Sequence, residues 1–186
     1  MKKYLSLFLC FVFALSFASC GKKETKQDDY IGEGLKTQLK MLVMANLNFY
    51  SYSFVSSTLK TDDKKPIEKD GVKWLPVNDS LFASYDEFLT SLNVVYTPEC
   101  VEKILQEYDF YAEIDGKFCI KADVVKAEDS EKWEMDPAFT AEIVSNKEDK
   151  ISVKYAFKKG EQTKKQTYTF INTSSGYRLD KLYKLG

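Results

Sequence analysis

The sequence predicts an α+β fold in which N-terminal helices pack on a curved antiparallel sheet. Apolar residues recur with the 3.6-residue period of a helix as far as Tyr108, and with the two-residue period of a strand after Asp109. Helices followed by strands within one chain are typical of α+β domains. Because the later apolar residues alternate with polar ones, one face of the sheet is expected to pack on the first helix.

The helical half contains three predicted helices. The first covers residues 35–59, and Asn46 and Ser53 lie inside its apolar face, where we interpret them as satisfied core polar groups or as the site of a bend. The second covers residues 85–95, behind the capping-box sequence Ser84-Tyr85-Asp86-Glu87. The third begins at Thr97-Pro98-Glu99, because threonine caps helices, proline is tolerated in the first turn and glutamate favours the positive helix end.

The strands are predicted from alternation and turn signals. Asp115-Gly116 indicates a hairpin between strands at residues 110–114 and 117–124. Residues 126–137 are expected to form a polar connection that carries Trp133. The other expected strands lie at residues 72–77, 139–145, 150–158, 166–172 and 177–185, with an exposed hairpin tip over residues 159–165.

The first twenty residues indicate the destination of the chain. Two lysines precede an apolar run that is too short for a comfortable transmembrane helix, which is the pattern of a secretory signal peptide. The run ends in Phe17-Ala18-Ser19-Cys20, a relaxed form of the sequence that precedes the acylated cysteine of bacterial lipoproteins. We therefore expect a signal peptide over residues 1–19, a lipidated Cys20 with a flexible tether over 20–33, and a single α+β domain over 34–186.

Composition restricts the possible functions. The chain has 27 basic and 28 acidic residues, no histidine, and Arg178 as its one arginine. Without histidine, Ser-His-Asp and Cys-His catalytic systems and histidine-ligated zinc are excluded. A single arginine excludes phosphate clamps built from several arginines. No basic stripe marks a nucleic-acid surface, and no motif calls for a metal or another cofactor.

The cysteines of the predicted domain leave two alternatives open. Disulfides persist in exported proteins, so Cys100 and Cys119 are a possible disulfide pair. The other interpretation is two separate thiols buried as small apolar groups. Cys119 alternates with Lys117 and Lys121 on a predicted strand, which places it on the more polar face and disfavours simple burial.

Aromatic residues supply the candidate binding sites. Tyr111, Phe118, Tyr155 and Phe157 are the candidate lining of a concave apolar pocket on the sheet, although most such residues belong to cores. Trp133 is a candidate interface residue because it lies in a polar loop, and the alternative is packing of that loop onto the sheet. The candidate catalytic carboxylates have structural explanations as turn or solvated strand residues, so we expect no enzyme: Glu113, Asp115, Asp123 and Asp180.

The order of several short motifs resembles a known family. The motifs are Lys73-Trp74-Leu75-Pro76-Val77, Ser84-Tyr85-Asp86-Glu87-Phe88-Leu89, Thr97-Pro98-Glu99, Asp115-Gly116-Lys117-Phe118 and Gly176-Tyr177-Arg178-Leu179-Asp180. Together they resemble the bacterial DL-endopeptidase inhibitors (IseA-like), and the layout resembles the cystatin-like or nuclear-transport-factor-2-like roll. The resemblance implies a roll that binds and blocks cell-wall cysteine peptidases, without identifying the inhibitory residues.

Taken together, these features predict an envelope lipoprotein with a non-catalytic protein-binding domain, possible partners being cell-wall hydrolases. The alternative is a binder of a small apolar ligand or lipid in a concave sheet pocket. Gly21 occupies the position where a retention-type aspartate would stand in enteric bacteria, which favours an outer-membrane or cell-surface address.

The lipid anchor is directly testable. We expect Cys20→Ser to abolish labelling with a lipid precursor and to release the protein from the membrane fraction, because stable anchoring needs the two chains of a diacylglycerol. Membrane fractionation and metabolic lipid labelling measure both effects. Unchanged membrane association with labelling retained would exclude this anchor.

Overall fold

The computed structural model describes residues 31–54, 59–124 and 132–185 and confirms the α+β class. Its helices are α2 (Glu33–Asn48), the π-helical continuation η2 (Phe49–Phe54), α3 (Tyr85–Val95) and α4 (Pro98–Glu107). Its strands are β1 (Ile67–Lys69), β2 (Val72–Pro76), β3 (Tyr111–Ile114), β4 (Lys117–Lys121), β5 (Glu134–Met135), β6 (Glu142–Lys147), β7 (Lys150–Lys159), β8 (Gln162–Thr173) and β9 (Gly176–Leu179). No helix in these three stretches is long and apolar enough to cross a membrane.

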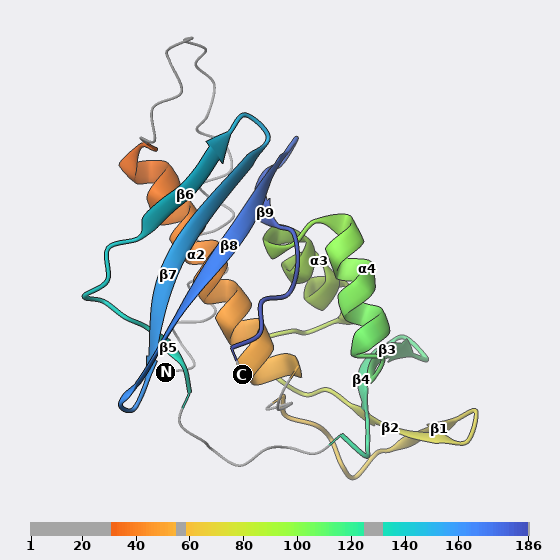
Figure 1. Cartoon of the computed structure of the whole chain (residues 1–186). Coiled ribbons are helices and arrows are strands. Elements are labelled where there is room, and N and C mark those ends of the chain that lie inside the picture. The colour runs from red at the N-terminus through yellow and green to blue at the C-terminus, as the bar shows by residue number, and fades with distance from the viewer. Residues whose placement is uncertain (1–30, 55–58, 125–131, 186) are drawn as a thin grey trace.

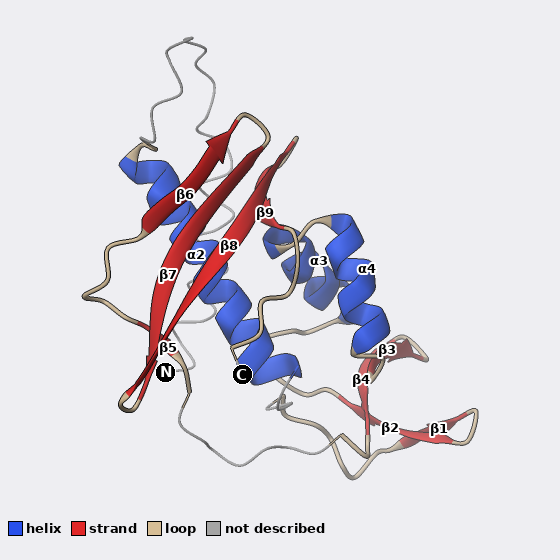
Figure 2. Ribbon diagram, viewed as in Figure 1, coloured by secondary structure: helices blue, strands red, loops and turns tan. Residues whose placement is uncertain are grey.

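The strands form two antiparallel sheets, so the expectation of one sheet was wrong. The smaller sheet has the order β1-β2-β4-β3, and the larger has the order β5-β7-β8-β9 with β6 also paired to β7. The reason is a long-range pairing: β4 uses its free edge for β2, with Pro76 opposite Cys119, and does not join the C-terminal strands. Figures 1 and 2 show α2 lying across one face of the larger sheet, with α3 and α4 on the side of β9.

Local signals position the helix starts and the hairpins. The Ser84 hydroxyl accepts the Glu87 amide at 3.1 Å, and the Thr97 hydroxyl caps α4 by accepting the Cys100 amide. Both Asp-Gly turns have positive φ at both residues, 54° and 75° at Asp70-Gly71 and 51° and 71° at Asp115-Gly116. Those angles match the type I′ turn, whose twist suits a two-residue hairpin.

Several boundaries differ from the sequence-based expectation. Ile31 is 5% exposed and belongs to the main core, although it lies within the expected tether over 20–33. The connection expected over residues 126–137 contains the short strand β5. Strand β8 starts at Gln162, so the hairpin tip expected over residues 159–165 is a tight turn between β7 and β8. Residues 55–58 of the expected first helix and residues 125–131 of the connection lie outside the described residues, as do the signal sequence and Cys20.

The last strand ends earlier than expected, because the chain leaves the sheet to enter the core. β9 stops at Leu179, and Tyr183 and Leu185 are 3% and 4% exposed. The Thr169 amide on β8 donates to the Tyr183 hydroxyl at 2.7 Å, where a longer β9 would have paired. The Tyr183 hydroxyl in turn donates to the Asp180 carboxylate at 2.7 Å.

One contiguous core joins both sheets to the helices. Its centre is an aromatic cluster in which Phe88 contacts Tyr111 and Phe118 with ring centroids 4.9 and 5.2 Å apart. Such offset and tilted ring pairs are favoured by the aromatic quadrupole. The largest side chains that are fully buried come from α2, α3, α4 and both strands of the β7–β8 hairpin, or from the residues that connect them: Tyr96, Tyr168, Phe88, Phe157, Phe170, Leu39, Leu59, Leu92 and Ile104.

Asn46, one of the two polar residues inside the apolar face of the first helix, is a satisfied core group, which was one of the two expectations. The Asn46 amide donates to the Tyr183 carbonyl at 2.9 Å, and its oxygen accepts the Tyr183 amide at 2.9 Å and the Tyr96 hydroxyl at 3.1 Å. The backbone carbonyl of Ser53 accepts the Tyr111 hydroxyl at 2.7 Å. Asn46 thus connects α2 to the C-terminal segment and to the junction between α3 and α4.

Removal of the Asn46 side chain is expected to lower the free energy of unfolding by about 3 kcal/mol, since each buried polar group left unpaired costs about 1–3 kcal/mol. Urea unfolding of residues 20–186 carrying Cys20→Ser, with and without Asn46→Ala, measures this. The matched control is Asn93→Ala, whose side chain bonds the Leu89 carbonyl on an exposed helix surface and should change stability by less than about 0.5 kcal/mol. Equal effects of the two substitutions would contradict the role given to Asn46.

Candidate binding groove

The four residues expected to line a sheet pocket lie in the core instead. Tyr111 and Phe118 belong to the smaller sheet, whereas Tyr155 and Phe157 belong to β7 of the larger one. All four side chains are at most 5% exposed. The predicted pocket was therefore wrong, because it assumed that all four residues share one concave sheet. Of the four, Tyr155 lines a cavity described below.

The two cysteines are free thiols in separate clusters, which is the second of the two alternatives. Cys100 lies in the main core, and Cys119 is fully buried beside Trp74 and Ile114 on the other face of the smaller sheet. The expectation that Cys119 faces a polar surface was wrong, because Trp74 covers that face. Burial and, secondarily, the charge of Asp180 raise the pKa of the Cys100 thiol to about 11, and burial also raises the pKa of Cys119.

The candidate carboxylates do not form a common site. Asp115 occupies the tight turn between β3 and β4, and Asp180 accepts the Tyr183 hydroxyl after β9. Glu113 lies on β3, in the same hairpin of the smaller sheet as Asp115, whereas Asp180 follows a strand of the larger sheet. In the described stretches no three histidine, cysteine, aspartate or glutamate side chains form a group able to hold a metal ion.

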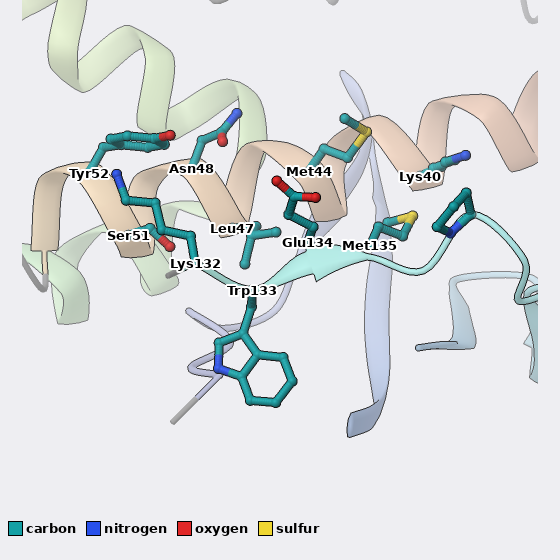
Figure 3. A pocket seen from close by; sticks show the side chains of 11 residues that line it. Lys40, Met44, Leu47, Asn48, Ser51, Tyr52, Lys132, Trp133, Glu134 and Met135 are labelled. Carbon is teal, nitrogen blue, oxygen red and sulfur yellow. The ribbon is translucent and has the colours of Figure 1, made fainter. Parts of the chain in front are cut away.

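A hollow of the described surface lies beside α2. A cavity of about 410 Å³ separates this helix and η2 from the segment that contains β5 (Figure 3). The helical wall consists of Lys40, Met44, Leu47, Asn48, Ser51 and Tyr52, and the opposite wall consists of Lys132, Trp133, Glu134, Met135 and Pro137. Met44 is 38% exposed, one of two large apolar side chains of the described residues with that much exposure.

A second cavity continues the first toward the start of α2. It has a volume of about 270 Å³ and shares Lys40, Met135 and Pro137 with the first. Its other lining residues are Glu33, Lys36, Thr37, Asp136, Phe139, Ala141 and Tyr155. We call the two cavities together the α2 groove.

The α2 groove combines apolar walls with charged rims. The Lys132 ammonium lies 3.7 Å from the centroid of the Tyr52 ring, and Figure 3 shows this lysine reaching across the groove. Two acidic residues of the second cavity form ion pairs. Glu33 pairs with Lys36 at 2.6 Å, and Asp136 pairs with Lys158 at 3.1 Å. The Ala138 amide donates to Asp136, and this bond, followed by Lys158, lowers the pKa of that carboxyl.

Trp133 is half-buried, so it is not the exposed loop anchor that the sequence indicated. Its indole packs against the main core and also lines the α2 groove. This agrees with the alternative of loop packing, and Figure 3 shows the ring pointing away from α2. The groove residues Lys40, Met44 and Met135 were not expected from sequence. Met44 alone left a signal, as an apolar residue outside the predicted buried face of the helix.

No family model and no curated protein matches the chain.

The thiols give a test of this arrangement. In residues 20–186 carrying Cys20→Ser, we expect no reaction with Ellman's reagent at pH 8 while the protein is folded, because both thiols are buried and protonated below their raised pKa values. Unfolding in guanidinium without reductant should then release two reactive thiols per chain. Recovery of no thiol after unfolding would show the disulfide alternative to be correct.

Proposed function

We propose that the chain is a lipid-anchored protein of the bacterial cell envelope whose domain binds a partner protein and has no catalytic role. The observation that carries this proposal is the α2 groove, an open hollow whose walls combine apolar side chains with charged and polar ones. A groove of this kind can receive the side chains of a partner's segment. Methionines at such sites adapt to different contacts, which suits Met44 and Met135.

The shape of the groove favours an extended segment of a partner over a small ligand. Small-molecule sites enclose most of their ligand, whereas both cavities here are open to solvent and follow the helix one after the other. The alternative function, an apolar ligand on a concave sheet, loses support because its four candidate residues are in the core.

The backbone of β5 provides a further reason for an extended partner. Met135 is paired with Phe157, and the next amide, that of Asp136, donates to the Ala156 carbonyl. In an antiparallel pair, residues alternate between bonding the neighbouring strand and pointing their backbone groups away from it. The N–H and C=O of Met135 therefore point away from β7, where a partner strand can add to the edge.

The narrower proposal concerns the partner. The family resemblance favours an envelope protein of the cell-wall hydrolase class, with the domain as regulator or inhibitor. An outer-membrane or cell-surface location follows from the residue after Cys20 and stays part of the same proposal. The lipid anchor would hold the domain within a tether length of such enzymes.

Peptide binding tests the groove. We expect a library of random twelve-residue peptides, panned against residues 20–186 carrying Cys20→Ser, to yield peptides that bind the parent protein. Met44→Asp should weaken them at least about tenfold, because it places a charge against the apolar wall where contacts are desolvated. Fluorescence polarisation with labelled peptides measures the affinities.

The matched control is Val144→Asp. Val144 is 53% exposed at a bulge of β6 and does not line the groove, so the same chemical change there should leave peptide affinity unaltered. Failure to recover any binding peptide, or equal loss in both variants, would refute the groove as the binding site. An added arm uses a cell-wall cysteine peptidase, whose inhibition by the parent but not by Met44→Asp would support the narrower proposal.

A further inference from the structure

The second cavity is lined by a tyrosine whose hydroxyl has no hydrogen-bond partner among the described residues. Tyr155 is 4% exposed as a residue and lines this cavity, and its hydroxyl is not among the fully buried unpaired atoms of the described chain, of which the Tyr168 hydroxyl is the example. A hydroxyl that has no protein partner and is accessible at a cavity wall can donate to a ligand atom. Burial alone raises the pKa of Tyr155, so the hydroxyl keeps its proton and is available as a donor.

Lys40 supplies a second donor at the same place. It lines both cavities, is exposed, and forms no ion pair with any described residue. In contrast, Lys36 of the same cavity is paired with Glu33, and the acidic Asp136 is paired with Lys158. Among the residues that line the second cavity, Lys40 is therefore the charge without an ion pair to a described residue, whereas Glu134 is a carboxylate, likewise without such a pair, of the first cavity, which Lys40 also lines.

The chemistry of these groups selects the ligand. A lysine ammonium has only donors, and the protonated hydroxyl of a tyrosine that lines the same cavity can donate as well, so both fit an anionic acceptor. Glu33 and Asp136 border the same cavity and would repel a doubly charged phosphate. A single carboxylate, flanked by carbon atoms that contact Phe139 and Pro137, matches the site better.

We propose that Lys40 and Tyr155 form a subsite for an aspartate or glutamate side chain of the extended segment that occupies the α2 groove. This inference rests on the proposed function and deepens it by naming the ligand chemistry. It assigns the second cavity to the acidic side chain and the first cavity, beside Met44 and Leu47, to apolar side chains of the same segment.

The geometry also predicts a spacing. Lys40 and Met44 are four residues apart on α2 and therefore lie one helical turn, about 6 Å, from each other along the groove. Side chains on the same face of an extended strand recur every two residues, which is about 6.6 Å. The preferred segment therefore carries an acidic residue two positions from an apolar one, in either chain direction.

The experiment is a double-mutant cycle, in which one residue of the peptide and one residue of the protein are changed separately and together. Peptides recovered by panning are resynthesised with the acidic residue changed to its amide, and their affinities are measured by fluorescence polarisation. For the parent protein we expect the amide peptide to bind about tenfold more weakly or worse, because the change removes a hydrogen bond to a charged group. In Lys40→Gln and Tyr155→Phe the same peptide change should alter affinity less than about threefold, because one donor is already absent.

The control is Lys150→Gln, which changes the net charge equally but lies on β7 away from the groove and should preserve the tenfold loss. Recovered peptides that lack acidic residues, or an undiminished loss in Lys40→Gln, would overturn the subsite while leaving the groove as a binding site. Failure to recover any peptide would instead count against the proposed function.

A titration with a small molecule tests the subsite even if panning yields no binding peptide. N-acetyl-glutamic acid α-methylamide and its glutamine counterpart are titrated into protein with ¹³C-labelled tyrosine rings, and the Tyr155 signals are assigned with Tyr155→Phe. We expect saturable shifts of these signals with the acid alone, and their loss in Lys40→Gln. Unchanged Tyr155 signals at tens of millimolar acid would overturn the proposal.

Discussion

The fold depends on the hydrogen bonds that the buried Asn46 side chain makes to the C-terminal segment. Its amide pairs with both backbone groups of Tyr183 and accepts the Tyr96 hydroxyl, at distances of 2.9 to 3.1 Å. Because the site is sealed from water, each of these groups would be left unpaired if the others moved. The first helix, the α3–α4 junction and the end of the chain are thereby held in one arrangement.

That constraint positions the helical wall of the α2 groove. Asn46 and Leu42 hold one side of α2 in the core, so Lys40, Met44 and Leu47 are presented on the other side without freedom to turn inward. The opposite wall depends on β7, which pairs with Met135 of β5 and carries Tyr155. A groove whose walls are both attached to the core is organised before a partner arrives, which reduces the entropy lost on binding.

The sequence predicted the elements that rest on local interactions, and it mispredicted those that rest on distant ones. The caps at Ser84 and Thr97 and the turn at Asp115-Gly116 were found where expected, because each involves neighbours within four residues. The division into two sheets depends on the pairing of β2 with β4, more than forty residues apart, for which alternation carries no information. The groove was missed for the same reason, since its walls come from residues about ninety positions apart.

The sequence by itself determined the α+β class, the position of Asn46 inside the apolar face of the first helix and the exclusion of histidine chemistry, because composition and periodicity are properties of the chain alone. Only the tertiary structure decided that Cys100 and Cys119 lie apart, that Tyr155 is a groove residue, and that Tyr183 belongs to the core and not to a strand. Each of these depends on which surfaces meet after folding. A residue can bury itself against several partners with similar gain in apolar contact, and the packing of the whole chain selects among them.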